Sequence, residues 1–286
     1  PVYMDDLMKY RRARKQRNEV LRQYKNRPDP PPQPVLEPWT EEIVALGSRV
    51  IARRHEFLAT FTRYLRDAYE RIDAVAEEPS IEYDTIADLD ALAAETEGAG
   101  EAKGDDTHRT LTAESVAAAF RDELARKAGS EQDRGTPLVG PQRDELVFRL
   151  DGLEVRRYGS QGQHRTFGMA LKLAQYFYLR DRADTEPLLL LDDAFGKLDR
   201  ERTEVFLQLL ESDDVGQSLI TATRRRPFAE TIDFSASAHR AFQVDRVDGR
   251  ARVSVDEEVG SGTVRTGDDE AEPESTRERI QSSAAS

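Results

Sequence analysis

The run Ser160-Gln161-Gly162-Gln163 is the first group of residues suited to chemistry, and it precedes a predicted helix. Serine with glutamine three residues later is the pattern of a capping box, in which each side chain bonds the other residue's backbone N–H. Apolar residues then recur at helical spacing (Ala170, Leu173, Ala174 and Phe177). A helix N-terminus presents N–H donors and the positive end of a dipole, which suits a phosphate. The alternative is an ordinary helix cap.

The second group is the apolar run Leu188–Leu191 followed by Asp192 and Asp193. Four leucines in a row predict a strand buried on both faces of a largely parallel sheet. Ligands of such sheets bind at the carboxyl ends of the strands, where both aspartates would lie. One carboxylate can hold Mg²⁺ while its neighbour orients a water molecule. The alternative is a polar pair that only ends the strand.

The order of these groups resembles the ATP-binding-cassette ATPases of the SMC, Rad50 and RecF type, in which a signature helix, a Walker B strand and a D-loop follow one another. Within that group the chain is similar to the RecF family over residues 1 to about 255. The resemblance is carried by Gly140-Pro141-Gln142-Arg143-Asp144, Ser160-Gln161-Gly162-Gln163-His164-Arg165, Leu171-Lys172-Leu173-Ala174, Leu190-Leu191-Asp192-Asp193, Gln16-Arg17-Asn18 and the segment from Trp39 to Arg53-Arg54.

The resemblance implies a role for each site residue. The signature residues (Ser160, Gln161, Gly162 and Gln163) would contact ATP bound by a second subunit. Asp192 would assist Mg²⁺, and Asp193 would be the catalytic group that positions water. Because aspartate is one methylene shorter than the glutamate usual in this superfamily, slow hydrolysis is expected.

Further roles are implied downstream. Asp199 would be the D-loop acid at the dimer interface; the plainer interpretation is the N-cap of the next helix, and both roles can hold at once. Thr221 or Thr223 would replace the histidine with which transporter ATPases sense the γ-phosphate.

The function that the resemblance implies is an ATP-dependent DNA-binding clamp, a homodimer that acts with RecR and RecO in the cytoplasm. It would serve recombinational repair of gapped DNA, replication recovery and SOS induction, and would bind single-strand/double-strand junctions without reading sequence. One alternative is a nucleotide-dead interaction module that retains the fold, and another is a different SMC- or Rad50-like ATPase. A transporter subunit is disfavoured because the switch histidine is missing.

The phosphate-binding pattern G-x-x-x-x-G-K-[ST] is absent from the sequence, which begins with Pro1. We therefore expect the C-terminal part of a RecF-like ATPase that lacks the Walker A lobe and is inactive alone. The expected fold class is α/β, with an inserted helical arm. The predicted division is a helical insertion over 1–136, a signature and Walker B lobe over 137–255, and a disordered acidic tail over 256–286. Within the arm we expect a proline-rich connector at 28–38 and an acidic loop at 87–106.

Helices are predicted over 3–26, from a cap at Thr40, from a cap at Thr112 to a stop at Gly129, and over 200–210. The second helix carries five arginines off its apolar stripe (Arg49, Arg53, Arg54, Arg63 and Arg66). Arginines repeated along one helix could follow a DNA backbone, while the plainer interpretation is a solvated face. Short strands are predicted at 81–83 and 218–221. Hairpins are predicted around Asp151-Gly152 and Asp248-Gly249.

The composition sets limits on function. The 286 residues carry Lys+Arg 42 and Asp+Glu 55, a formal net charge of −13. This balance argues against a DNA binder held by bulk charge, yet the first 27 residues are basic. A strongly acidic, lysine-poor chain is expected in a salt-loving host. Cysteine is absent, which excludes disulfides and thiolate metal sites. No apolar run is long enough to cross a bilayer, so no membrane partner is expected.

Overall fold

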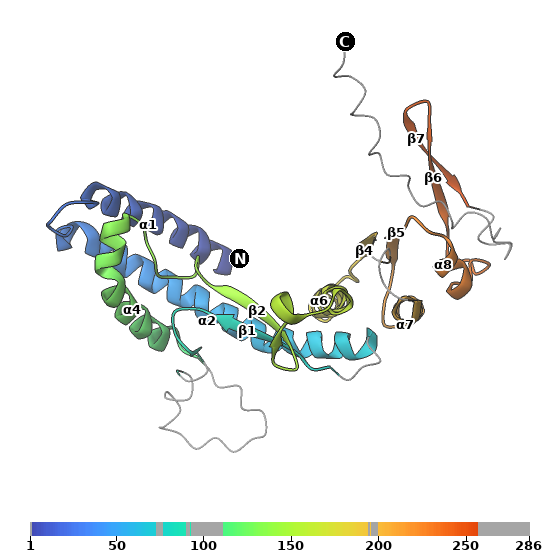
Figure 1. Ribbon diagram of the computed structural model, residues 1–286, viewed down its shortest axis with the longest axis horizontal. Coiled ribbons are helices and arrows are strands. Elements are labelled where there is room, and N and C mark those ends of the chain that lie inside the picture. Colours follow the sequence, from blue (N-terminus) through green and yellow to red (C-terminus); the bar gives the residue numbers. More distant parts are fainter. Residues whose placement is uncertain are drawn as a thin grey trace, which may run out of the picture. The chain divides into compact units, whose positions relative to one another are not determined.

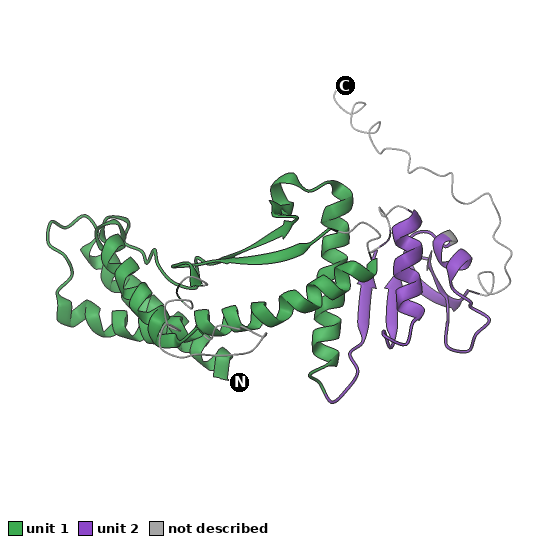
Figure 2. Cartoon of the chain, turned by 90° about the horizontal axis from the view of Figure 1, so that it is seen from below, with its two compact units in different colours: residues 1–183 green, residues 184–286 purple. Residues whose placement is uncertain are grey.

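The computed structural model describes residues 2–72, 77–89, 92, 111–193, 195 and 200–256. Most of the predicted acidic loop and nearly all of the predicted acidic tail lie outside these residues. The chain forms two compact units, residues 1–183 and 184–286, shown in green and purple in Figure 2. The predicted division into functional domains at residue 137 stays a prediction.

Three helices build the helical arm of the first unit: α1 (Val2–Tyr24), α2 (Gln33–Ile72) and α4 (Ala113–Arg134). In Figure 1, α1 lies along the first half of the long α2 helix. Each helix has apolar residues at 3.6-residue spacing, which places them on one face. Their shared core comprises Tyr10, Ala13, Ile43, Val44, Leu46, Phe120, Leu124 and Val139.

The α2 helix begins earlier than predicted. The expected proline-rich connector reached residue 38 with Thr40 as the cap, but the helix starts at Gln33 and contains Pro38. Pro34 lies in the first turn, where the N–H that proline lacks would have no partner, whereas Pro38 lies in the second turn and cannot donate the usual helical bond to the residue four positions earlier. Thr40 is therefore inside the helix, where its hydroxyl donates to the Leu36 carbonyl at 3.1 Å and accepts the Arg17 Nε–H at 3.0 Å.

The α4 helix begins as predicted and ends later. The Thr112 hydroxyl accepts the Ser115 N–H at 3.2 Å, which confirms the cap. The predicted stop at Gly129 is wrong, because the helix continues to Arg134 and ends at Gly135, whose φ of 64° is left-handed. A glycine inside a helix lowers helix propensity without ending the helix. A stop requires the left-handed conformation that Gly135 adopts.

A three-stranded antiparallel sheet of order β1-β2-β3 connects the arm to the helix that begins at Gln161. Its strands are β1 (Pro79–Asp84), β2 (Glu145–Leu150) and β3 (Leu153–Glu154). The predicted hairpin is confirmed at Asp151-Gly152, where both residues have positive φ, as a two-residue turn requires. Its second strand, expected over 153–157, ends at Glu154, because Val155–Tyr158 forms a helical turn, α5.

Helix α6 (Gln161–Arg180) packs against the second half of α2 through aromatic side chains. Tyr178 meets Phe57 edge-on with ring centroids 5.3 Å apart, and Tyr69 lies 6.1 Å from Phe167. The Arg71 guanidinium lies 5.1 Å from the Phe177 ring centroid, a cation–π contact. Helix α2 therefore contacts α1 along one part of its length and α6 along another.

The second unit contains a parallel pair, β4 (Leu189–Asp192) and β5 (Ser218–Thr221), with helices α7 (Arg200–Glu211) and α8 (Arg226–Thr231). The chain then forms the predicted hairpin, β6 (Phe242–Val247) and β7 (Arg250–Val255). The expectation that β4 is buried on both faces is wrong for this chain. Leu189 and Leu191 are buried, whereas Leu190 on the other face is 64% exposed. A run of leucines predicts an apolar strand, but it does not indicate whether other elements cover both faces of that strand.

Candidate functional site

The N-terminus of α6 has the predicted capping box. The Gln163 N–H donates to Ser160 Oγ at 3.1 Å, and the Ser160 N–H donates to Gln163 Oε1 at 2.7 Å. Ser160 has extended backbone angles, as a cap residue should, and its side chain is exposed. The structure therefore presents Ser160, Gln161 and Gly162 at the surface of a helix N-terminus, where N–H donors and the helix dipole favour an anion.

No pattern in the sequence indicates the residue that supports this cap. The Gln163 side-chain amide donates to Glu77 Oε1 at 2.7 Å, and the Tyr69 hydroxyl donates to Glu77 Oε2. Tyr69 lies near the C-terminal end of α2, so one carboxylate joins the α6 cap to the arm. Glu77 follows a helix with no motif around it, and Gln163 is 86 residues away. Only the folded chain brings them together.

The tandem acids stand at the carboxyl end of β4, as predicted, and both side chains are exposed. In the parallel register Asp192 faces Thr221 on β5. The Thr221 hydroxyl donates to Asp192 Oδ1, and its oxygen accepts the Asp193 N–H at 3.1 Å. Asp193 has a φ of 45°, a left-handed conformation that aspartate tolerates better than most residues. Thr221 therefore fixes the Asp192 carboxylate and the Asp193 backbone, whereas Thr223 lies two residues beyond β5.

The acid pair suits Mg²⁺ by ligand chemistry. Mg²⁺ binds oxygen ligands and usually keeps several waters, with only one or two carboxylates from the protein. No cluster of three or more His, Asp or Glu side chains that could enclose a metal occurs in the described ranges. Two exposed carboxylates match the open type of site that a magnesium–nucleotide complex requires. Asp199 lies outside the described residues.

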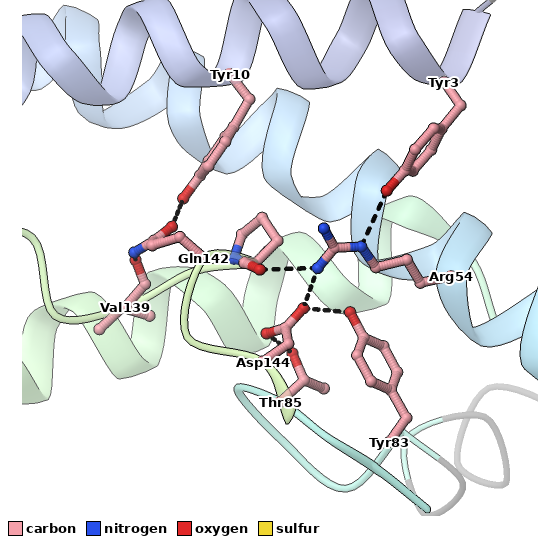
Figure 3. Close-up of polar contacts among 9 residues, drawn as sticks. Tyr3, Tyr10, Arg54, Tyr83, Thr85, Val139, Gln142 and Asp144 are labelled. Carbon is pink, nitrogen blue, oxygen red and sulfur yellow. Dashed lines mark hydrogen bonds and ion pairs between the residues drawn. The ribbon is translucent and has the colours of Figure 1, made fainter. Parts of the chain in front are cut away.

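A buried polar cluster fixes the loop Gly140–Asp144. The Arg54 guanidinium donates to Asp144 Oδ2 at 2.9 Å and to the Pro141 carbonyl at 2.8 Å, and its Nε–H donates to the Tyr3 hydroxyl at 3.1 Å (Figure 3). The Asp144 carboxylate is 3% exposed and also accepts the Tyr83 and Thr85 hydroxyls. Burial, followed by the charge of Asp144, raises the pKa of Tyr83, which keeps this hydroxyl protonated as a donor.

The five arginines proposed for DNA contact lie on α2, and acidic partners can be named for Arg49, Arg53, Arg54 and Arg66. Arg49 forms a two-bond pair with Asp6 at 3.0 and 3.2 Å, and Arg53 lies 3.9 Å from the same carboxylate. Arg54 belongs to the buried cluster, and Arg66 pairs with Glu78 at 3.2 Å. Arg63 lines a groove beside β1 with Arg53 and Arg66. A role in DNA contact stays a prediction for all five, and the ion pairs favour a structural role for Arg49 and Arg54.

The sequence relatives and the solved structures that match the chain carry the same name. The chain is 62% identical over 261 residues to the DNA replication and repair protein RecF of Salinibacter ruber, a match that covers 91% of this chain and 59% of that relative. It is 36% identical over 229 residues to the protein of the same name from Chloroherpeton thalassium, covering 80% and 57%. The chain belongs to the RecF family. It spans a little under three-fifths of the length of these relatives.

RecF structures also match the fold. A solved structure of the recombination mediator protein RecF with ATPrS, in the RecFOR pathway, superposes with a TM-score of 0.63 at 21% identity, covering 88% of this chain and 58% of that one. A RecF–ATP structure gives 0.62 at 23% identity. The predicted fold class is therefore confirmed. No protein-family model matches the chain. No helix within the described residues is long and apolar enough to span a membrane.

Proposed function

We propose that this RecF-family chain supplies the signature and Walker B part of an ATP-dependent DNA clamp. Two copies would close around two Mg²⁺–ATP molecules, and the closed dimer would hold DNA at a single-strand/double-strand junction without reading its sequence. The process would be recombinational repair of gapped DNA, replication recovery and SOS induction in the cytoplasm, with RecR and RecO as partners.

The observation that carries this proposal is the exposed capping box at Ser160, in a chain 62% identical to a RecF protein. Its serine hydroxyl and the free N–H groups of the first α6 turn have the chemistry to contact a γ-phosphate presented by a second copy. An exposed position is required for contact in trans, and Ser160 and Gln161 have it. The Glu77 bridge holds the cap in place before any ligand arrives, which lowers the ordering cost of binding.

The acid pair would act on the nucleotide held by its own copy. Asp192 would assist Mg²⁺, and Asp193 would orient the attacking water. Thr221 keeps the Asp192 carboxylate and the Asp193 backbone in a fixed relation. The shorter reach of aspartate compared with glutamate favours slow turnover, as suits a switch. A RecF-type lobe with a Walker A loop would have to complete the nucleotide site, and the exposed Leu188, Leu190 and Leu219 give such a lobe an apolar face to cover.

The test uses the longest protein that the parent gene encodes. Its mass in solution is measured by light scattering with and without Mg²⁺–ATP, and its ATP hydrolysis is followed over hours. Ser160→Arg should abolish ATP-dependent dimerisation, because the long arginine side chain would occupy the N-terminus of α6, where the γ-phosphate is proposed to bind. Asp193→Asn should leave dimerisation intact and lower hydrolysis by about two orders of magnitude.

Thr112→Arg is the matched control. It removes the cap of α4, a different helix, and should lower stability by about 1 kcal/mol while dimerisation persists. If Ser160→Arg and Asp193→Asn both behave as the parent does, the assignment of this site is wrong. DNA binding that ignores nucleotide, with no dimer at saturating ATP, would instead establish the nucleotide-dead interaction module.

A further inference from the structure

The outer face of α1 carries cations in a regular row. Arg11, Lys15 and Arg22 are separated by four and seven residues, spacings that return to the same side of a helix with 3.6 residues per turn. All three side chains are exposed. The opposite side of α1 is buried against the rest of the arm through Tyr10, Ala13 and Leu21. The row therefore lies on the side of α1 that faces away from the core shared with α2.

These cations differ from the arginines of α2 in their partners. Within the described part of the chain, Arg11, Lys15 and Arg22 take part in no ion pair, whereas Arg49 and Arg54 are held by buried carboxylates. An arginine that already pairs with an acid must give up that pair before it can bind a phosphate. The row on α1 carries no such cost.

The positive charge near the N-terminus contrasts with the negative net charge of the whole chain. Residues 1–27 contain nine lysines and arginines and three acids, while the chain has a net charge of −13. One of the three acids, Asp6, is neutralised by Arg49. The outer face of α1 therefore presents positive charge on a protein that elsewhere repels a polyanion, and such a local field attracts nucleic acid.

The spacing of the row fits a phosphate backbone. With a rise of about 1.5 Å per residue, the row spans about 16 Å along α1, a length that covers four or five phosphates of one DNA strand. Long flexible cations make contacts to phosphates but do not read bases, which suits binding without sequence preference.

We propose that the outer face of α1 is a nucleic-acid contact surface, in which Arg11, Lys15 and Arg22 bind the phosphates of DNA. This inference rests on the proposed function only in requiring that the protein binds DNA, and it assigns that contact to α1 instead of α2. The surface serves duplex and single-stranded DNA alike, because both present the same phosphate chemistry.

The test compares the full parent gene product with three variants of it. The first variant changes the row to glutamine (Arg11→Gln, Lys15→Gln and Arg22→Gln). The second changes three exposed cations of α4 (Arg126→Gln, Lys127→Gln and Arg134→Gln), which alters the net charge equally. Fluorescence anisotropy gives the affinity of each variant and the parent for a labelled duplex and a labelled single strand between about 50 and 200 mM KCl, with Mg²⁺–ATP present. Urea midpoints confirm that both variants fold, as expected for exposed changes to a good helix former.

The α1 variant should bind DNA at least about tenfold more weakly than the parent at the lowest salt. Its slope of log affinity against log salt should become shallower by about 0.9 for each duplex phosphate that the protein no longer neutralises, and by about 0.7 on single strands. The α4 variant should keep the parent slope. A parent slope in the α1 variant would overturn the inference while leaving the proposed function in place.

A third variant tests whether the DNA contact surface lies on α1 or on α2. If Arg53→Gln, Arg63→Gln and Arg66→Gln together reduce the slope more than the α1 variant does, the contact surface lies on α2 and the inference fails. If the α1 variant binds DNA normally but no longer binds a protein partner, the face serves a protein and the inference also fails. A parent protein that binds no DNA at any salt concentration would refute both the inference and the proposed function.

Discussion

Arg54 on α2 and Asp144, directly before β2, form an ion pair with a 2.9 Å separation, although they stand 90 positions apart in the sequence; the Asp144 side chain is buried and that of Arg54 is 29% exposed. Asp144 is the last residue of the segment Gly140-Pro141-Gln142-Arg143-Asp144, one of those that carry the resemblance to RecF. Its carboxylate accepts two further hydroxyl donors. The pair therefore fixes the loop that enters β2 against the middle of α2 (Figure 3).

Removing one member of this pair should be costly. Arg54→Met should lower the free energy of unfolding by about 3–5 kcal/mol, because it leaves the Asp144 charge buried without its cation. Urea denaturation measures the effect. Arg121→Met, which breaks the exposed pair with Glu41, should cost less than about 1 kcal/mol. A similar small effect for Arg54→Met would mean that the pair contributes little to the arm.

Three glycines provide a graded test of the arm's packing. Gly140 has a φ of 118°, and a Cβ there would collide with the Tyr10 hydroxyl and the Phe120 ring. Gly140→Ala should therefore destabilise the protein by about 2–4 kcal/mol.

The other two glycines are its controls. Gly152 has a φ of 77° in open space, so Gly152→Ala should cost about 1 kcal/mol from the backbone alone. Gly129 lies inside α4 with no atom near its Cβ position, so Gly129→Ala should stabilise by up to about 1 kcal/mol. Equal melting temperatures for the three variants would contradict this order.

Asp6 should make stability depend on pH in the acid range. Hydrogen bonds from Arg49 are the main reason that the pKa of Asp6 is lowered in the folded chain. The unfolded chain then binds the proton more tightly, so the contribution is present above pH ~4 and disappears as pH falls through the folded pKa.

Asp6→Asn should flatten the dependence of the urea midpoint on pH between about 5 and 2. Arg49→Gln removes the same bonds from the other side and should flatten most of the curve, because only the weaker effects of Arg53 and Lys9 on the pKa of Asp6 remain. The urea midpoint of the double variant should depend on pH in the same way as that of Asp6→Asn alone. An additional destabilisation in the double variant would show that the two residues act separately.

Thr221 should matter more for hydrolysis than for folding. Thr221→Val keeps the side-chain shape but removes the hydroxyl that bonds Asp192 and accepts the Asp193 N–H. The Thr221 carbonyl still accepts that N–H at 3.2 Å, so the strand pair persists. We expect stability to fall by less than about 1 kcal/mol and ATP turnover in the complete protein to slow about tenfold.

Thr221→Ser should restore turnover because it restores the hydroxyl, and Thr223→Val is the matched neighbour that should change little. Turnover that falls as much with Thr223→Val as with Thr221→Val would mean that the hydroxyl bond to Asp192 has no special role.

Local elements could be predicted well from the sequence, because their signals are local. The apolar stripe of α4, the Thr112 cap and the two Asp-Gly turns each depend on a few neighbouring residues. The capping box at Ser160 was predicted for the same reason. The start of α2 was missed because a proline-rich run favours an extended chain, although Pro34 and Pro38 are both accommodated in the helix.

The contacts that hold the site together were beyond prediction from one sequence. Glu77 meets Gln163 across 86 residues, and nothing in either segment's pattern indicates the other. The same holds for the ion pairs of the α2 arginines, whose spacing suggested a solvated face or a DNA surface. Charge patterns indicate where cations lie along a helix, but only packing decides which of them are already neutralised.

The length of α2 has a mechanical consequence. Its 40 residues form a rod about 60 Å long, with α1 fastened toward one end and α6 toward the other. A rotation of only about 5° at the α6 end would carry the opposite end through about 5 Å, roughly the pitch of one helical turn. A small movement of α6 at Ser160 would in this way displace α1, the helix that carries Arg11, Lys15 and Arg22, by several ångströms.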